Sequence, residues 1–224
     1  MNKKLQVLYA FILLAFFVSG CASSKPERSA IGAQYRIKGQ IKNGAYSSPD
    51  KNFSCPLPDF VGPGTVVMDR SDRVQGGIMG TVGFDGGDGD LYRIEWYEMT
   101  SDQETKLKNF EMQRPMLEMV RSRELQMFRS FSPKVTIEHE EITGEGEQAQ
   151  KFFVLHASQA ANVEDSENRS DSTRGFLIFI RQKWIYALSI QDTAPFYAKT
   201  EPPETRNARL KAELEKFSQT INFS

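Results

Sequence analysis

Short segments in which apolar and polar residues alternate recur along this 224-residue chain and predict β-strands. In LYRIEWYEM (91–99), Tyr92, Ile94 and Trp96 occupy every second position, so one face of this strand is expected to be largely apolar. The turn-rich DGGDGD links it to IMGTVGF (78–84), which predicts a β-hairpin. Weaker strand candidates lie earlier in the chain, at 33–42, 52–58 and 64–69.

Two more pairs of strands are predicted in the second half of the chain. KVTIEHEEI (134–142) and AQKFFVLHAS (149–158) flank TGEGE, which indicates another hairpin. GFLIFI (175–180) and KWIYALSIQ (183–191) are continuous or nearly continuous apolar runs, so we expect them at the centre of the sheet. The polar segment 162–174 has no periodicity and is expected to be a mobile loop.

Helical spacing of apolar residues marks two further regions. The first covers 103–129 and is expected to break or kink near Arg114, because Pro115 follows. The second covers 203–221 and carries a single apolar stripe with the spacing i, i+4, i+7, i+11. The stripe consists of Leu210, Leu214, Phe217 and Ile221.

The order of these elements predicts the fold class. Strands, a helix, two hairpins and a helix follow one another without βαβ alternation, which argues against a doubly wound parallel sheet. We expect a single α+β domain in which an antiparallel sheet is packed by a central helical segment and a C-terminal helix. SSPDKNFSCPLP, and GFLIFIRQKWIYALSIQ followed by LKAELEKFSQTI, loosely resemble the first and last parts of PsbP/Mog1-type α/β sandwiches. That resemblance implies a binding or assembly module.

The N-terminal residues have the three parts of a secretory signal. Lys3 and Lys4 precede an apolar run, Leu5 to Val18, which is followed by the small residues Ser19 and Gly20. The run is shorter than the roughly 20 residues that cross a bilayer, so a transmembrane anchor is the weaker interpretation. Residues 1–20 are therefore expected to be a signal peptide.

VSGC, which ends at Cys21, resembles the lipobox of bacterial lipoproteins. The resemblance implies acylation of Cys21 and cleavage between Gly20 and Cys21, whereas an ordinary signal peptide with a chance cysteine is the alternative. Two or more acyl chains hold a protein stably on a membrane. Residues 21–33 are then expected to be a flexible lipidated tether and residues 34–224 the globular domain.

The residue after the cysteine predicts the membrane to which the protein is attached. By the same resemblance, Ala22, in place of the aspartate that marks inner-membrane retention, favours the periplasmic face of the outer membrane. Display of the protein on the cell surface is the alternative.

Charge narrows the classes of partner. Without residues 1–20, the 28 Lys and Arg residues fall to 26 against 29 Asp and Glu residues, which gives a formal charge of −3. A chain with no basic excess is not expected to bind nucleic acid. We expect attachment to the membrane through the N-terminal acyl chains, an envelope protein or cell-wall component as partner, and no cofactor.

Cys55 is the second of two cysteines, so acylation of Cys21 leaves it without a disulfide partner in the chain. It lies in NFSCPLPDF, an alternating segment, and is expected to be a small buried hydrophobic residue. An intermolecular disulfide and a catalytic thiol are the alternatives, although His139 and His156 form no recognisable motif with it.

Three aspartates in FDGGDGDLY are weak candidates for a calcium site: Asp85, Asp88 and Asp90. The spacing fails the EF-hand order, because Gly87 and Gly89 occupy ligand positions, and it also fails the repeated calcium-binding nonapeptide. A solvated hairpin turn is the preferred interpretation.

IEHEEI places His139 and Glu141 on one face of a strand, which gives only two ligands where a transition metal usually takes three or four. If Thr143 pairs with Glu147 across the hairpin, His139 lies opposite Lys151. An exposed and charged edge strand is the preferred interpretation.

The methionines of the central helix are expected to fill the core, with a pliable partner groove as the alternative. They are Met112, Met116, Met119 and Met127. Trp96 and Trp184 are expected to be core aromatic residues. No nucleophile elbow, Walker loop, zinc-protease motif or CxxC is present.

These observations favour a non-enzymatic binding or assembly module. The alternative is an envelope hydrolase whose site is assembled from scattered carboxylates, which would need a deep pocket with two carboxylates of perturbed pKa.

Overall fold

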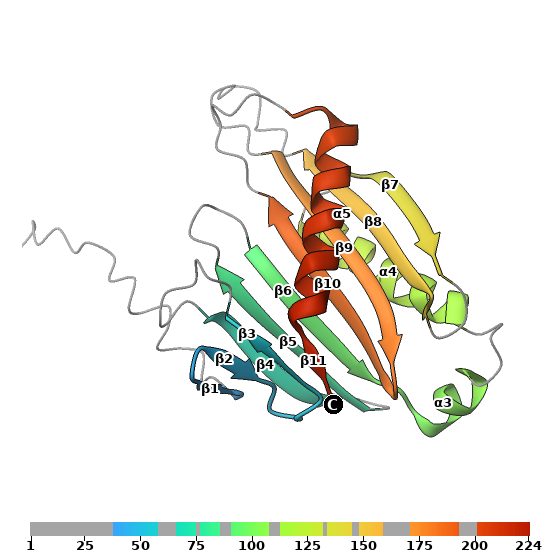
Figure 1. Cartoon of the computed structure of the whole chain (residues 1–224). Helices are drawn as coiled ribbons and strands as arrows, with labels where there is room; N and C mark the ends of the chain where they lie inside the picture. The colour runs from blue at the N-terminus through green and yellow to red at the C-terminus, as the bar shows by residue number, and fades with distance from the viewer. Residues whose placement is uncertain are drawn as a thin grey trace, which may run out of the picture. The chain divides into compact units, whose positions relative to one another are not determined.

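Seven strands of the described residues form the main sheet, in which all neighbours run antiparallel (Figure 1). They are β4 (Val66–Val74), β5 (Gly77–Asp85), β6 (Leu91–Glu98), β7 (Val135–Thr143), β8 (Gln150–Ser158), β9 (Asp171–Arg181) and β10 (Trp184–Asp192). The order across the sheet is β4-β5-β6-β10-β9-β8-β7. The two continuous apolar runs, β9 and β10, therefore lie inside the sheet, where both of their faces are covered.

The structure is a computed structural model that describes nine segments, all within a unit that spans Tyr35–Ser224. The segments are 38–57, 66–74, 77–85, 91–107, 113–131, 134–144, 148–158, 171–192 and 201–224. In these segments, no helix combines the length and the apolar composition that a membrane crossing requires.

A smaller sheet has the order β1-β2-β3-β11, where β1 is Gln40–Lys42, β2 is Ala45–Ser47, β3 is Phe53–Pro56 and β11 is Asn222–Phe223. Asn43 and Gly44 join β1 to β2 with φ values of 53° and 73°. Asparagine and glycine tolerate this left-handed backbone best, and it matches the twist of a two-residue hairpin. The smaller sheet contributes Tyr46, Phe53 and Cys55 to the core.

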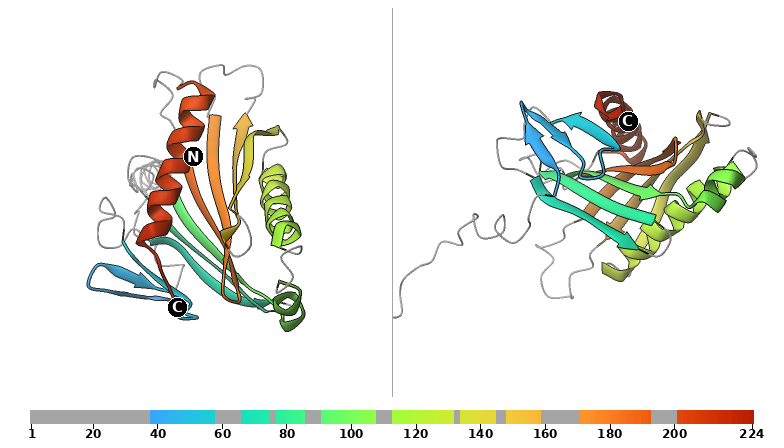
Figure 2. Two further views of the ribbon diagram at one scale, coloured as in Figure 1. Left: turned by 45° about the vertical axis from the view of Figure 1, so that its right-hand side comes forward. Right: turned by 90° about the horizontal axis from the view of Figure 1, so that it is seen from below.

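Three helices are described: α3 (Ser101–Leu107), α4 (Gln113–Phe131) and α5 (Pro203–Thr220). Figure 2 shows α4 on one face of the main sheet, and α5 with the smaller sheet on the other. These two faces are called the α4 face and the α5 face below. The chain is thus a single α+β domain with an antiparallel sheet packed by helices, as the sequence predicts.

The α5 face has a continuous apolar core. All four residues of the predicted stripe, Leu210, Leu214, Phe217 and Ile221, are buried there. A Cβ atom on Gly175 in β9 would lie only 3.1 Å from the Leu210 Cβ atom, so a glycine lets α5 approach the sheet closely. The α4 face has its own core, in which the rings of Phe153 and Phe176 stack at 4.6 Å.

The strand and helix predictions are confirmed in most places. The hairpin of β5 and β6 is present, and α5 begins at Pro203. The central helical region contains α3 and α4, but Arg114, where a break was expected, lies inside α4, and residues 108–112 lie outside the described residues. Trp96 and Trp184 are buried core residues.

Two predictions were wrong. The mobile loop over 162–174 fails at its C-terminal end, because β9 already begins at Asp171 and both Thr173 and Arg174 are buried. Charge at these positions does not mean exposure, since the strand is covered on both faces. Residues 162–170 lie outside the described residues.

The expected register of the second hairpin was also wrong. Thr143 pairs with Gln150, so His139 lies opposite Val154 and not opposite Lys151. The connection is longer than a tight turn, and the register shifts between Ile137 and His139.

Candidate functional site

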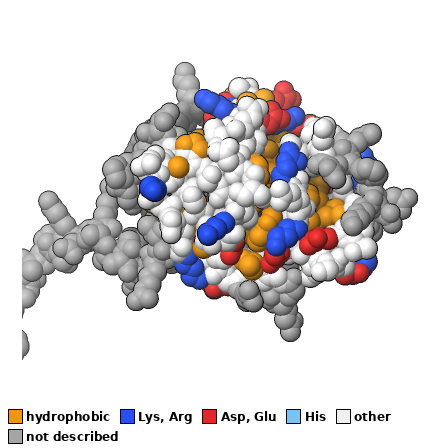
Figure 3. Space-filling view, turned by 60° about the horizontal axis from the view of Figure 1, so that its bottom comes forward, with side chains coloured by type: hydrophobic (Ala, Val, Ile, Leu, Met, Phe, Trp, Pro, Cys, Tyr) orange, Lys and Arg blue, Asp and Glu red, His pale blue; other side chains and the backbone are white. Residues whose placement is uncertain are grey.

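A groove opens between α4 and the end of the main sheet at which β6 leads to α3. Its volume is about 240 Å³. Its apolar lining includes Ile78, Met79, Tyr97, Met119, Val120 and Ile185. Figure 3 looks toward this end of the sheet and shows hydrophobic surface, in orange, interspersed with Lys and Arg side chains in blue.

Met119 and Arg123 are four residues apart and therefore lie on the same side of α4, where both line the groove. The Met119 side chain is 51% exposed, and only Ile41 among the other large hydrophobic residues described is also exposed. The Arg123 guanidinium lies over the Tyr97 ring, 4.7 Å from its centroid. No ion pair joins Arg123 to a carboxylate in the described segments.

A buried polar cluster shares Tyr97 with the groove. The cluster is defined here as Arg93, Glu95 and Tyr97 of β6, Glu124 of α4 and Arg174 of β9. Arg93 Nη1 lies 2.9 Å from Glu95 Oε1. The Tyr97 hydroxyl donates to Glu95 Oε2 at 2.8 Å and lies 3.2 Å from Glu124 Oε1. The cluster therefore joins α4 to β6 through polar contacts.

Both carboxyl groups of the cluster approach the Tyr97 hydroxyl. Glu124 is fully buried, and the Tyr97 hydroxyl lies between it and Glu95. Burial, and next the charge of Glu95, raises the pKa of Glu124 to about 8. Glu124 is therefore the carboxyl group of the cluster in which burial favours the protonated form.

Arg174 adds a second guanidinium to the cluster. Its Nη2 atom donates to Gln191, and the group stacks on the Phe128 ring at 4.6 Å. Burial, followed by the charge of Arg93, lowers the pKa of Arg174. The cluster thus combines the guanidinium groups of Arg93 and Arg174 with the carboxyl groups of Glu95 and Glu124.

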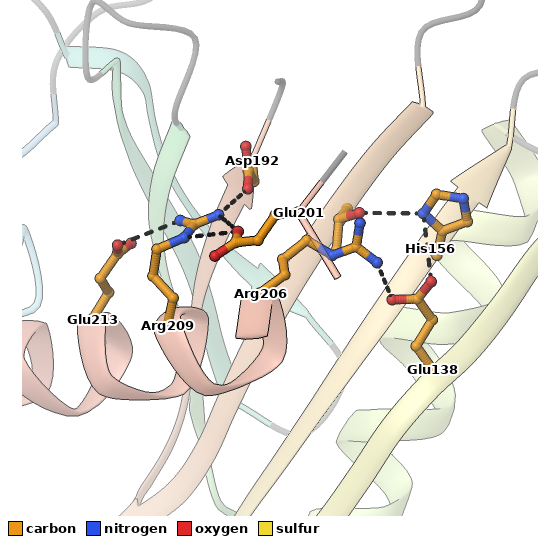
Figure 4. Close-up of polar contacts among 8 residues, drawn as sticks. Glu138, His156, Asp192, Glu201, Arg206, Arg209 and Glu213 are labelled. Carbon is orange, nitrogen blue, oxygen red and sulfur yellow. Dashed lines mark hydrogen bonds and ion pairs between the residues drawn. The ribbon is translucent and has the colours of Figure 1, made fainter. Parts of the chain in front are cut away.

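The α5 face is closed by ion pairs at the N-terminal half of α5 (Figure 4). Arg209 contacts Asp192, Glu201 and Glu213, and Arg206 contacts Glu138. His156 Nδ1 lies 3.2 Å from the Thr173 hydroxyl and 3.8 Å from Glu138. Lys211 lies 2.6 Å from Glu141. The contacts of Arg206, of Lys211 and of Arg209 with Asp192 join α5 to the sheet, so we assign them a structural role.

The predicted role of Cys55 as a small hydrophobic residue is confirmed. Its side chain is buried in the core of the α5 face, and burial raises the pKa of the thiol to about 12. A thiol in this environment stays protonated and is a poor nucleophile.

The calcium and transition-metal candidates find no support in the described residues. Asp88 and Asp90 lie outside them, as does the side chain of Asp85. His139 is 3.8 Å from Glu141, but Glu141 is held by Lys211, and the His139 ring packs on Phe152. No group of three or more His, Cys, Asp or Glu side chains that could hold a metal ion occurs in the described segments.

The edge position predicted for residues 134–142 is confirmed, since β7 ends the main sheet. Its charges are less solvated than expected, because they are paired. Glu138 contacts Arg206, Glu140 lies 2.8 Å from Arg121, and Glu141 contacts Lys211.

The methionines of the central helix divide between the two roles that the sequence left open. Met116 is buried in the core of the α4 face, whereas Met119 is exposed in the groove. Met127 is partly buried, and Met112 lies outside the described residues.

The polar cluster was missed by sequence reasoning. One signal was available: Leu117, Val120 and Glu124 have the spacing i, i+3, i+7 of a single helix face, so Glu124 interrupts an apolar stripe. The partners on β6 gave no such signal, because Arg93 and Glu95 were on the strand face expected to be polar.

Comparisons with known proteins find only loose likenesses to solved structures. No protein-family model matches it, and no curated protein matches it. The solution structure of cyanobacterial PsbP from Synechocystis sp. is 12% identical, with a TM-score of 0.44, and the match covers 80% of this chain and 91% of that one. The crystal structure of the Saccharomyces cerevisiae Ran-binding protein Mog1p is 8% identical, with a TM-score of 0.42, over 84% of this chain and 96% of that one. Both likenesses are loose and concern the fold alone.

Proposed function

We propose that this chain is a lipid-anchored, non-enzymatic binding or assembly module on the periplasmic face of the outer membrane, and that the groove beside α4 receives its partner. One observation supports the groove as the binding site. Met119 and Arg123 line an apolar groove on a chain whose other large hydrophobic side chains, in the described segments, are nearly all covered. Methionine side chains adapt to varied partners, so a groove lined by them offers a binding site.

The anchor rests on the sequence alone. Residues 1–37, which include the predicted signal peptide, Cys21 and the tether, lie outside the described residues. The order of charge, apolar run and lipobox supports acylation at Cys21, and multiple acyl chains would keep the domain at the membrane.

The two cysteines provide a matched test of the anchor. Cys21→Ala is expected to move the protein from the membrane fraction to the soluble fraction and to remove the mass of the acyl chains. Cys55→Ala, which changes a buried core thiol, should leave both unchanged. A Cys21→Ala protein that stays in the membrane fraction and keeps the acyl mass would contradict lipidation at this residue.

The groove is tested by two aspartate substitutions on one helix. The full chain, purified in detergent, is used as bait for envelope extracts, with Met119→Asp compared with Gln126→Asp. Gln126 is exposed on α4 but does not line the groove. An envelope protein or cell-wall component that binds the wild type should be lost with Met119→Asp and kept with Gln126→Asp. Recovery that is equal in all three proteins would remove the groove from the proposal.

A second function, an envelope hydrolase, is favoured by one observation: Glu95 and Glu124 form a carboxyl pair in which one pKa is strongly raised. Neither carboxyl group lines the groove, however, and both side chains are buried. A hydrolase would lose its activity on cell-wall fragments in Glu124→Gln, whereas a binding module would show no such activity in either form.

A further inference from the structure

We infer that the groove binds the C-terminal residue of a partner polypeptide, with an apolar last side chain among the methionines and the terminal carboxylate on Arg123. This inference rests on the proposed function, because it names the chemistry of the partner that the groove would receive.

The size of the groove limits the ligand. At about 240 Å³, it falls below the range of roughly 300–1,000 Å³ that holds cofactors and drug-sized molecules. One or two amino-acid side chains fill such a volume, so a short stretch of polypeptide fits better than a prosthetic group.

The charge of the groove suits an anion. Arg123 is paired with no carboxylate in the described segments and contacts only the Tyr97 ring and the Met79 sulfur atom. Among the described residues, Glu98 is the one carboxylate that lines the groove, and it lies 2.6 Å from Lys183 Nζ, which neutralises it. A guanidinium group in this setting favours a carboxylate.

The short distance between the Arg123 guanidinium and the apolar lining favours the C-terminal residue of a polypeptide as the ligand. The Arg123 guanidinium lies directly against Tyr97 and Met79, and Met119 is one helical turn away. A ligand must therefore present a carboxylate and an apolar group within a few ångströms of each other. The last residue of a polypeptide does so within one residue, because its carboxylate and side chain share a Cα atom. An internal acidic residue needs a second residue for the apolar group.

Four fluorescein-labelled hexapeptides test this inference with the full chain in detergent, by fluorescence anisotropy. The first ends in leucine with a free carboxylate, and the second is its C-terminal amide. The third ends in glycine with a free carboxylate, and the fourth has an internal leucine–aspartate pair with an amidated end. The first should bind about fivefold more tightly than each of the others, a modest ratio because Arg123 is exposed to solvent.

Two arginine variants locate the effect. Arg123→Met should reduce the ratio between the first peptide and its amide to about one. Arg129→Met changes an exposed arginine of the same helix that does not line the groove, and should leave the ratio unchanged. Equal loss in both variants would overturn the assignment, since it would indicate a general charge effect.

The remaining outcomes separate this inference from the proposed function. If the amide or the internal aspartate peptide binds as tightly as the free leucine end, recognition of a chain end is wrong. If no peptide binds but Met119→Asp still abolishes capture of an envelope partner, the groove is a binding site for another chemistry, and only this inference fails. If both tests are negative, the proposed site itself is wrong.

Discussion

The two faces of the main sheet are covered by one long helix each, but they are built differently. On the α5 face, an uninterrupted apolar stripe meets an apolar sheet, and ion pairs from Arg206, Arg209 and Lys211 surround it. On the α4 face, the helix buries a carboxyl group, Glu124, and leaves Met119 in an open groove. The arrangement on the α5 face contributes mainly to the stability of the fold.

The second arrangement has features that stability does not require. Burying a carboxyl group costs free energy unless it is protonated or paired, and an apolar residue in the same position would avoid that cost. An exposed methionine likewise contributes little to folding. Departures from an ideal core tend to occur at functional sites, which is why we place the function on the α4 face.

The largest difference between the faces should appear when a side chain of each is shortened. Leu210→Ala removes a fully buried side chain from the α5 face and should lower the free energy of unfolding by about 3 kcal/mol. Met119→Ala in the groove should change it by less than about 0.5 kcal/mol, because half of that side chain is already in water. Urea denaturation measures both. Similar losses in the two variants would mean that the groove is part of the core.

The next largest effect is the pH dependence that Glu124 gives to the α4 face. Because its pKa is raised to about 8 in the folded chain, the folded state binds a proton that the unfolded state releases at lower pH. Its contribution to stability is therefore present at acidic pH and is lost as the pH rises through about 8. The loss from about pH 5 to about pH 8 should approach 3 kcal/mol.

Glu124→Gln checks that assignment, because the amide fills the same space without ionising. The variant should lose stability less steeply than the wild type over this pH range in urea denaturation. If the two proteins show parallel pH profiles, Glu124 does not carry the raised pKa.

A smaller effect is expected from the ion pairs of the α5 face. Arg209 contacts three carboxylates, but its side chain is 35% exposed, so solvent screens these contacts. Arg209→Met should cost about 1 kcal/mol at low salt and less at high salt. Lys216→Met, at an exposed position of the same helix, should cost nearly nothing at either salt concentration. Thermal melts at two salt concentrations distinguish a screened pair from a packing defect, which would not respond to salt.

The sequence predicts a face of the sheet well when the pattern that encodes it lies within one helix or one hairpin. The α5 stripe could be predicted because Leu210, Leu214 and Phe217 repeat within one helix, and an apolar helix face must meet an apolar surface. The hairpin of β5 and β6 is also a local feature. Even so, β2 was missed, although Asn43 and Gly44 form a strong turn signal.

The polar cluster depends on contacts that no local pattern contains. Glu95 and Glu124 are separated by a helix and a connection, and they meet only because α4 covers the face of β6 that the alternation marks as polar. Arg174 was assigned to a loop because its neighbours are polar, yet the strand begins before it. The open groove likewise depends on where α4 packs against the main sheet, and the sequence of α4 alone does not specify that position.

Photo-crosslinking in living cells tests the division between the two faces most directly. A photoreactive phenylalanine analogue is placed at Met119 in the groove and, as a control, at Ala212, an exposed position on α5. The account predicts a discrete crosslink to an envelope partner from position 119 and none from position 212. A partner captured from position 212 alone would contradict it, because the α5 face and not the groove would then be the binding surface.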